Sequence, residues 1–243
     1  SICPAVREAW ERRSTQLPGE QFWCYLQFDK NEGDIGGRDH RWHDPIVRPL
    51  PFVWPYALVF WAIYVWAFLP EWKIVQGGIE GAKGADSKDS GSMRVLLGGM
   101  WIALFLAFPL AFVRAWSFPP GAQLPMFAVG LSALVLGSLL RRYCWRTLGQ
   151  YFTGDVRARA DQPVIRTGPY RLVRHPSYTA GIMMFAGIGL ALGSWLSFVL
   201  LAIAAIATYA YRVTIEERVL LNTIGEPYRD YMRETKRFIP YII

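Results

Sequence analysis

Two polar segments of this 243-residue sequence flank its longest uncharged stretch, residues 178–211. The first, residues 168–178, is basic and contains a His-Pro pair, and the second, residues 211–217, contains an arginine followed by two glutamates. Charged groups beside an apolar stretch cost desolvation energy unless they are paired or bind a ligand, so they are the first candidates for a functional site. Arginines at such a site could orient an anionic ligand, and the glutamates could accept a proton.

The first polar segment has the pattern of a helix start. His175 precedes a proline and is therefore disfavoured in the helical region. Pro176 suits the first helical position, because its φ is fixed and it has no N–H group to leave unpaired. We expect the N–H groups of residues 177–179 to be free there, where a carboxylate or phosphate binds well. Arg171 and Arg174 add positive charge. An equally good interpretation of this segment is a basic collar, a ring of basic residues beside a membrane span that binds no ligand.

The second polar segment places its charges on one helix. Arg212 and Glu216 are four residues apart, so they can share a face and form a pair, while Glu217 lies one position further round. The alternative to a functional site is a structural ion pair at the membrane interface, which would stabilise the protein by under about 1 kcal/mol if it is exposed. Gly225 is typical of a helix C-terminus, and Pro227 could begin a short helix after it.

The elements that must position these groups are membrane spans. Three further uncharged runs are long enough for one crossing each: residues 52–69, 95–113 and 124–140. As a single helix, residues 178–211 would be about 51 Å long, which exceeds a bilayer core of about 30 Å. We therefore expect a turn at Gly193-Ser194 and two helices. The sequence predicts an all-α integral membrane protein with about five spans and a C-terminal helical hairpin; a cytoplasmic cofactor pocket follows only from the family resemblance given below.

The chain divides by composition into three parts. Residues 1–51 form a juxtamembrane or interfacial segment, and residues 52–140 hold three spans with a flexible loop at 76–92. Residues 141–243 are the expected catalytic region, in which the hairpin at 178–211 returns the chain to its starting side. Residues 141–177 contain eight Arg and two Asp, a net charge of +6 within the chain's +7. By the positive-inside rule this segment, and the active site with it, should face the cytoplasm.

Several other functions are disfavoured. The positive charge lies beside the spans, which favours anionic lipid headgroups over nucleic acid. His40 and His43, with Asp39 and Asp44, have a metal-like spacing, but without further histidine ligands a polar loop is the better interpretation, and we expect no metal site. Gly189 could make room for a cofactor, although close packing of two membrane helices is the more common reason for such a glycine.

The C-terminal hundred residues resemble the isoprenylcysteine carboxyl methyltransferase family, which is itself similar to phospholipid methyltransferases. Three stretches carry the resemblance: Leu148-Gly149 with Phe152; residues 162–178 with Gly181; and Arg212, Glu216-Glu217, Gly225, Tyr228 and Tyr231, ending near residues 237–240. The core of the second stretch reads Arg-His-Pro-Ser-Tyr. Residues 1 to about 140 match only in hydropathy.

The resemblance implies an integral membrane enzyme that uses S-adenosylmethionine, forms S-adenosylhomocysteine and lacks the soluble Rossmann-type fold. It implies cofactor contacts from one set of residues: Gln162, Val164, Ile165, Tyr170, Arg174, His175, Pro176, Ser177 and Tyr178. It places Arg212 and Glu216 at the substrate end, and Glu217 is the third catalytic candidate. Many family members have a different sequence at residues 162–165, where Pro163 here lacks an N–H donor.

The first functional hypothesis is therefore methyl transfer to a lipophilic acceptor, such as the carboxylate of a prenylated cysteine. A phospholipid amine or a small thiol is an alternative acceptor on the same scaffold, for which Glu216 or Glu217 could take the proton. An NADPH-dependent sterol-type reductase ranks lower, as does a structural membrane protein with a basic collar. Membrane lipids are expected neighbours, and the sequence leaves the oligomeric state open.

Overall fold

The computed structural model describes residues 46–82, 91–152 and 162–238, without the side chains of residues 73–82. Five long helices run through these ranges: α3 (Tyr56–Ala82), α4 (Ser92–Leu110), α5 (Pro120–Leu148), α6 (Pro176–Ala191) and α7 (Trp195–Ile224). A short helix, α8 (Glu226–Glu234), follows directly. One-turn 3₁₀ helices complete the order: η2 (Leu50–Phe52), η3 (Arg114–Trp116), η4 (Gly149–Tyr151) and η5 (Gly168–Arg171). The described chain forms only isolated β-bridges, which confirms the all-α prediction.

The composition of the helices is that of an integral membrane protein. Three described stretches are long and apolar enough to cross a bilayer, namely Ser92–Leu110, Pro120–Tyr151 and Trp195–Ile224. Two shorter apolar helices, Tyr56–Trp72 and Pro176–Ala191, accompany them. Large apolar side chains such as Phe105, which is 80% exposed, face outward, as expected for contact with lipid. Five complete crossings stay a prediction.

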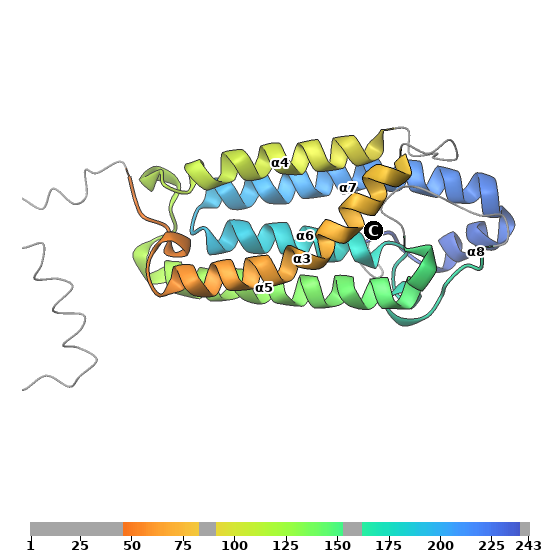
Figure 1. Ribbon diagram of the computed structural model, residues 1–243, viewed down its shortest axis with the longest axis horizontal. Helices are drawn as coiled ribbons and strands as arrows, with labels where there is room; N and C mark the ends of the chain where they lie inside the picture. The colour runs from red at the N-terminus through yellow and green to blue at the C-terminus, as the bar shows by residue number, and fades with distance from the viewer. Residues whose placement is uncertain (1–45, 83–90, 153–161, 239–243) are drawn as a thin grey trace, which may run out of the picture. The chain divides into compact units, whose positions relative to one another are not determined.

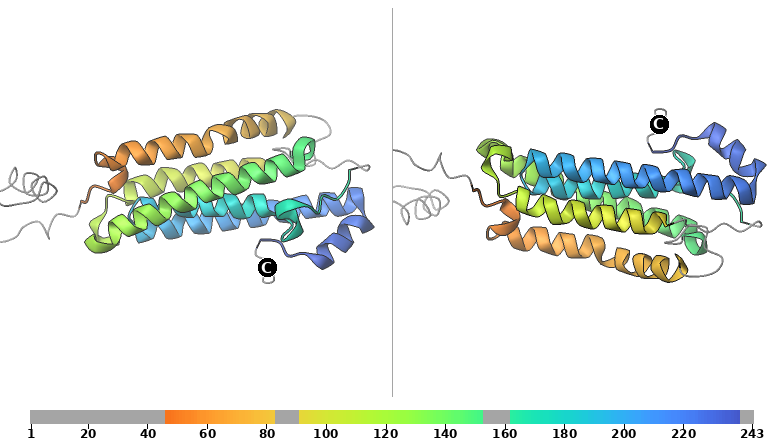
Figure 2. Two further views of the ribbon diagram at one scale, coloured as in Figure 1. Left: turned by 90° about the horizontal axis from the view of Figure 1, so that it is seen from below. Right: turned by 90° about the horizontal axis from the view of Figure 1, so that it is seen from above.

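The hairpin helix α6 lies at the centre of the bundle. It packs between α5 and α7, while α4 packs along α7 (Figure 1). Helix α3 begins beside α5 and crosses one face of the bundle towards the start of α4 (Figures 1 and 2). Leu134, Ile188 and Leu201, from three different helices, are completely buried in the core between them. The crossing of α3 brings its later turns close to the start of α4 (Figure 1).

Two predicted boundaries were wrong. The apolar run that begins at Phe52 does not end in a loop at residue 76, because α3 continues through Pro70 to Ala82. Helix α5 does not end at Arg141-Arg142 but continues to Leu148. Both arginines are accommodated inside the helix because each binds α3: Arg141 pairs with Glu71, and Arg142 Nη2 donates to the carbonyl of Trp66 at 2.6 Å.

The turn of the hairpin is at Gly193-Ser194, as predicted. Gly193 has φ +73°, a conformation that favours glycine, and Ser194 caps α7 by accepting a hydrogen bond from Ser197 N–H. Gly189 lies against α7, where an added Cβ would be 2.4 Å from Phe198 Cα. Its role is close helix packing, which the sequence favoured over room for a cofactor. The segment containing His40 and His43, with Asp39 and Asp44, lies outside the described residues.

Candidate functional site

The hairpin brings the two polar segments together at one end of the bundle. His175, at the start of α6, lies beside two glutamates of α7 that are more than 40 residues away along the chain. Its Nε2 is 3.3 Å from Glu217 Oε1, and its Nδ1 is 3.8 Å from Glu216 Oε2. The convergence expected from the hairpin is therefore confirmed.

Glu217 is the centre of a buried ion cluster. The residue is only 3% exposed. Arg174 Nε donates to its Oε1 at 2.9 Å, and Arg237 donates to its Oε2 through Nε (3.0 Å) and Nη2 (2.8 Å). Both carboxylate oxygens thus have cationic partners, which offsets the desolvation cost of burying the charge. Glu217 therefore has the contacts of a structural residue. It joins α7 to the segment of Arg174, which precedes the hairpin, and to the segment of Arg237, which follows α8.

Arg212 and Glu216 are connected through Tyr178. Arg212 Nε donates to Tyr178 Oη at 3.1 Å, and this hydroxyl donates to Glu216 Oε2 at 2.6 Å. Arg212 Nη1 also donates to Ser92 Oγ, at 3.0 Å, which ties the site to the start of α4. Since Arg212 is 3% exposed and Glu216 more accessible, the positive charge lies inside the protein and the negative charge at its edge. The pairing expected on one helix face therefore includes a residue from α6.

The chain after α8 fixes the His-Pro segment from outside. Arg174 N–H donates to Lys236 O at 2.8 Å, and His175 N–H donates to Arg237 O at 3.0 Å. From α8, the buried Tyr231 hydroxyl donates to Tyr170 O, and burial raises the pKa of Tyr231 to about 12, which keeps this donor protonated. Together these bonds hold residues 170–175 in one conformation without a regular helix.

The start of α6 is less open to anions than the sequence predicted. Pro176 does occupy the first turn, and His175 is the non-helical residue before it. However, the N–H groups of Tyr178 and Thr179 both donate to the carbonyl of His175, at 3.1 and 3.2 Å. The expectation of free N–H groups at both residues was wrong, because the first turn closes on the residue before the proline.

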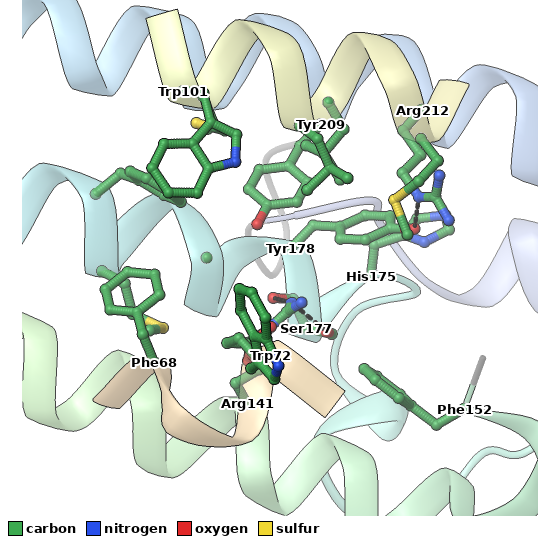
Figure 3. A pocket seen from close by; sticks show the side chains of 18 of the residues that line it. Phe68, Trp72, Trp101, Arg141, Phe152, His175, Ser177, Tyr178, Tyr209 and Arg212 are labelled. Atoms are coloured by element: carbon green, nitrogen blue, oxygen red, sulfur yellow. Dashed lines mark hydrogen bonds and ion pairs between the residues drawn. The ribbon is translucent and has the colours of Figure 1, made fainter. Parts of the chain in front are cut away.

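A cavity of about 600 Å³ lies beside this polar cluster, between α3 and α4 on one side and α5–α7 on the other. Its inner part is apolar, with Phe68, Met100, Leu104 and Met184 on its wall. Its other part is polar, lined by Arg141, Ser177, Tyr178 and Arg212 among others (Figure 3). This volume falls within the range of about 300–1,000 Å³ that is typical of small-molecule sites. The site thus combines an apolar chamber with cationic and hydroxyl groups at one end.

The expected cofactor residues divide between two cavities. Tyr170, Arg174, His175, Ser177 and Tyr178 line the main cavity. Gln162, Val164 and Ile165 instead line a cavity of about 70 Å³, which has Tyr170, Arg174 and His175 as common walls with the first. At this size the smaller cavity is well below the usual range for a ligand. Pro176 is buried and lines neither of them, so its part is to start α6.

Only one of the three expected catalytic residues, Arg212, lines the main cavity. Glu216 is separated from the cavity by the Tyr178 hydroxyl that it binds, and Glu217 lines a third cavity of about 280 Å³ together with Arg218 and Arg237. A direct proton transfer from an acceptor in the main cavity to either glutamate is therefore not supported by this arrangement.

The polar residues of the main cavity that were missed in the sequence include Glu71, Arg141 and Tyr209. Arg141 Nε donates to Glu71, and its Nη1 donates to Ser177 at the carbonyl (3.0 Å) and at Oγ (2.8 Å). The signal that could have revealed them is a charged residue within reach of the membrane interior on each of two runs. Arg141 was interpreted only as the end of its uncharged run, and Glu71 lies two residues past the run at 52–69.

The comparisons with known proteins agree with the motifs. Residues 125–226 match the family model of phospholipid methyltransferases. A protein-S-isoprenylcysteine O-methyltransferase B of Arabidopsis thaliana is 27% identical over 115 residues, covering 46% of this chain and 58% of that protein. The protein-S-isoprenylcysteine O-methyltransferase of Schizosaccharomyces pombe is 31% identical over 114 residues, covering 46% and 48%.

Among solved structures, a eukaryotic intramembrane Ras methyltransferase, isoprenylcysteine carboxyl methyltransferase, matches with 25% identity and a TM-score of 0.48, over 63% of this chain and 53% of that one. The matched part of the chain spans about half the length of the curated relatives. The C-terminal part of the chain is thus related to the isoprenylcysteine and phospholipid methyltransferases, which confirms the resemblance predicted from its motifs.

Proposed function

We propose that this chain is an integral membrane methyltransferase that uses S-adenosylmethionine to methylate the carboxylate of a lipophilic acceptor of the prenylcysteine type. The observation that carries the proposal is the main cavity, in which an apolar chamber ends at the guanidinium of Arg212. A long apolar chain fits the chamber, and its terminal carboxylate would meet the arginine. The relatedness of residues 125–226 to methyltransferases supports the type of reaction.

The donor would be held at the polar end of the same cavity. When bound, S-adenosylmethionine supplies a methyl group on a positively charged sulfur, which leaves as the neutral thioether of S-adenosylhomocysteine. His175, Tyr178 and Tyr209 form a stack of rings there, with centroids 5.5 and 4.9 Å apart. Aromatic faces attract cations, so this stack is a suitable neighbour for the donor. The fit favours Tyr170, Arg174, His175, Ser177 and Tyr178 as donor contacts, whereas Gln162, Val164 and Ile165 would join only if the small cavity opened to the large one.

The residues of the site have separate tasks in this proposal. Arg212 orients the acceptor carboxylate, which needs no base because it is already an anion. Because the donor would supply the methyl group on a sulfonium and the acceptor would already be an anion, no residue of the chain would need to move a proton. Glu216 holds the Tyr178 hydroxyl, and Glu217 holds Arg174 and His175, so both glutamates are positioning residues. The surrounding apolar wall excludes water.

Access to the cavity fits a membrane-borne acceptor. Trp72 of α3 and Trp101 of α4 line the cavity, and both side chains are more than 60% exposed on the outside of the bundle. The cavity therefore reaches the outer surface between these two helices, where a lipid chain could enter sideways. We further propose that the polar end faces the cytoplasm, in keeping with the net charge of +6 on residues 141–177.

A phospholipid amine is the second candidate acceptor, since the matched family model is that of phospholipid methyltransferases. The charges of the cavity argue against it. Three arginines, Arg141, Arg174 and Arg212, line the cavity against one carboxylate, that of Glu71, which already pairs with Arg141. Like charges repel a protonated amine, and the two glutamates that could accept its proton lie outside the cavity wall. A carboxylate acceptor is therefore the better fit.

The test is methyl transfer by the purified protein in lipid vesicles. We expect a labelled methyl group from S-adenosylmethionine to appear in a base-labile ester of farnesylcysteine, and Arg212→Gln to lower this rate by roughly 100-fold. Arg218→Gln, on the same helix but outside the main cavity, should leave the rate unchanged.

The outcomes separate the alternatives. S-adenosylhomocysteine should raise the melting temperature of the protein, and NADPH should not. A base-stable label in phosphatidylethanolamine would favour the phospholipid amine. Full turnover by a folded Arg212→Gln variant would mean that the acceptor site is elsewhere.

A further inference from the structure

The main cavity has a second polar region, around Arg141, of which the proposed function has used only the aromatic ring of Tyr209. It is formed by Glu71 from α3, Arg141 from α5 and Tyr209 from α7. In Figure 3, Arg141 rises from below beside Ser177, and Tyr209 projects from α7 into the same space. Tyr209 is within electrostatic range of both charged residues.

Each of these three residues keeps a polar atom that binds nothing else in the described chain. Arg141 donates through Nε to Glu71 and through Nη1 to Ser177, so its Nη2 remains available as a donor. Glu71 accepts from Arg141 through Oε1, so its Oε2 remains available as an acceptor. The Tyr209 hydroxyl has no hydrogen-bond partner among the described residues, although the residue is only 5% exposed.

These atoms face open space rather than the packed interior. Within the described chain, Arg114 Nε is the one fully enclosed side-chain nitrogen or oxygen that lacks a partner. The unused atoms of Glu71, Arg141 and Tyr209 are therefore accessible, and the space that all three residues line is the main cavity. Buried polar groups without partners are costly, which favours their use by a ligand.

The chemistry of these atoms selects a zwitterion. Glu71 and Arg141 form a neutral pair, so the region attracts neither a lone cation nor a lone anion strongly. An adjacent carboxylate oxygen and guanidinium nitrogen match a ligand that carries an ammonium and a carboxylate on one carbon. The Tyr209 hydroxyl can donate to that carboxylate as well. This is the charge pattern of an α-amino acid.

We propose that Glu71, Arg141 and Tyr209 bind the amino-acid end of the methyl donor, with Glu71 on its ammonium and Arg141 and Tyr209 on its carboxylate. The inference rests on the proposed function and extends it to α3, which lies outside the matched residues 125–226. Arg141 also bonds Ser177, at the start of α6, so the amino-acid end lies beside the segment that holds the rest of the donor. Glycine at position 181 leaves room for the Tyr209 hydroxyl, because an added Cβ there would be 2.3 Å from that hydroxyl.

The test compares two ligands that differ in the amino-acid end. S-adenosylhomocysteine carries it, and 5′-methylthioadenosine has the same thioether-linked adenosine without it. Binding of each is measured by calorimetry on the full chain in detergent. For the wild type we expect tighter binding of S-adenosylhomocysteine. Glu71→Gln and Arg141→Gln should each weaken that binding about tenfold, and Tyr209→Phe about threefold, with methylthioadenosine affinity unchanged for all three.

Arg142→Gln is the matched control. Arg142 is the next residue on α5 and also binds α3, with its guanidinium 4.5 Å from the Trp66 ring centre, but it does not line the cavity. Its substitution should leave the binding of both ligands as in the wild type. Ligand-free melting curves check that each variant is folded. If Arg141→Gln fails to fold, the binding measured for Tyr209→Phe tests the proposal instead, because this change removes one hydroxyl and keeps the stacked ring.

Two results would overturn the assignment. Variants that weaken both ligands equally would show that the three residues only support the fold of the pocket. Variants that bind S-adenosylhomocysteine as the wild type does would show that its amino-acid end lies elsewhere. A wild-type protein that binds neither ligand would instead refute the proposed function itself, and the assignment with it.

Discussion

At the scale of residues, the polar end of the bundle is held by a few buried charges with several partners each. Glu217 binds Arg174 and Arg237 and lies against His175, so one carboxylate joins α7, the start of α6 and the segment after α8. Glu216, its neighbour in sequence, accepts a hydrogen bond from the Tyr178 hydroxyl, lies 3.8 Å from His175 Nδ1 and is more exposed. Adjacent glutamates that look equivalent in the sequence thus differ in burial and in partners.

Glu217→Gln should destabilise the protein because it leaves the buried guanidinium of Arg174 without its counter-charge. Breaking a buried ion pair costs roughly 3 kcal/mol or more. At about 2–4 °C per kcal/mol, thermal melting in detergent should show a decrease of roughly 6–12 °C. Glu226→Gln, which breaks the exposed pair with Arg229, serves as the control and should shift the melting temperature by under about 2 °C. Equal shifts for both variants would contradict this view of Glu217.

The sequence identified Arg212, Glu216 and His175 as neighbours because their spacing and the hairpin require it. It did not reveal which of them face the cavity, since that depends on how the Tyr178 ring and α6 pack against α7. It also missed Glu71 and Arg141, which are 70 residues apart. A pair between two helices depends on how those helices cross, and no local pattern in either run contains that information.

At the scale of elements, glycines set how closely the helices approach. Gly130 of α5 and Gly187 of α6 face each other: a Cβ added at Gly187 would be 2.6 Å from Gly130 O and 2.8 Å from Leu134 N. In a membrane, such contacts take the place of the hydrophobic effect as the main force between helices. The small residues are therefore needed where α6 passes between its neighbours.

Gly187→Ala should separate α5 from α6 and lower stability by about 1–3 kcal/mol, through overpacking. Gly98→Ala is the control, because a Cβ at Gly98 of α4 would meet nothing within 4 Å. This change should be neutral or stabilise by up to about 1 kcal/mol, in line with the higher helix propensity of alanine. Thermal melting of the two variants measures both effects. A Gly187→Ala variant as stable as the wild type would show that the interface can relax.

The uncharged runs predicted where the helices lie, but they did not predict where the helices end. Hydropathy detects only the apolar part of a helix. Helices α3 and α5 both continue into polar sequence, where ion pairs between helices and capping groups determine the end. Turn chemistry was a better guide than charge. Gly193 and Gly225 mark the ends of α6 and α7 because each has a positive φ, of 73° and 76° respectively.

At the scale of the whole molecule, the cavity is made by two groups of helices. Helices α5–α7 supply most of its polar groups, and α3 and α4 supply much of the apolar wall. The polar groups fall mainly within the residues that match the methyltransferase family model, whereas most of the apolar wall lies before them. In the proposed function, the contacts for methyl transfer and those for the lipid chain would thus lie mainly in different parts of the sequence.

Narrowing the apolar part should change which acceptors are used. Leu104→Trp adds bulk to the cavity wall on α4, so we expect the rate with a farnesylated cysteine to fall about tenfold or more, and the rate with a shorter geranylated one to fall less. Phe105→Trp, at the next position but facing outward, should not change the ratio. Rates measured for both acceptors in vesicles give the comparison. An unchanged ratio in Leu104→Trp would place the acceptor chain elsewhere.

The crossing of α3 over the bundle has a wider consequence. Glu71 and Trp72 of this helix line the cavity from outside the region that matches the family model, so a different sequence in α3 would change the cavity wall while the matched region stayed the same. In the proposed function, a change in α3 that keeps Glu71 would alter the fit of the lipid chain, whereas a change of Glu71 itself would also weaken the binding of the donor.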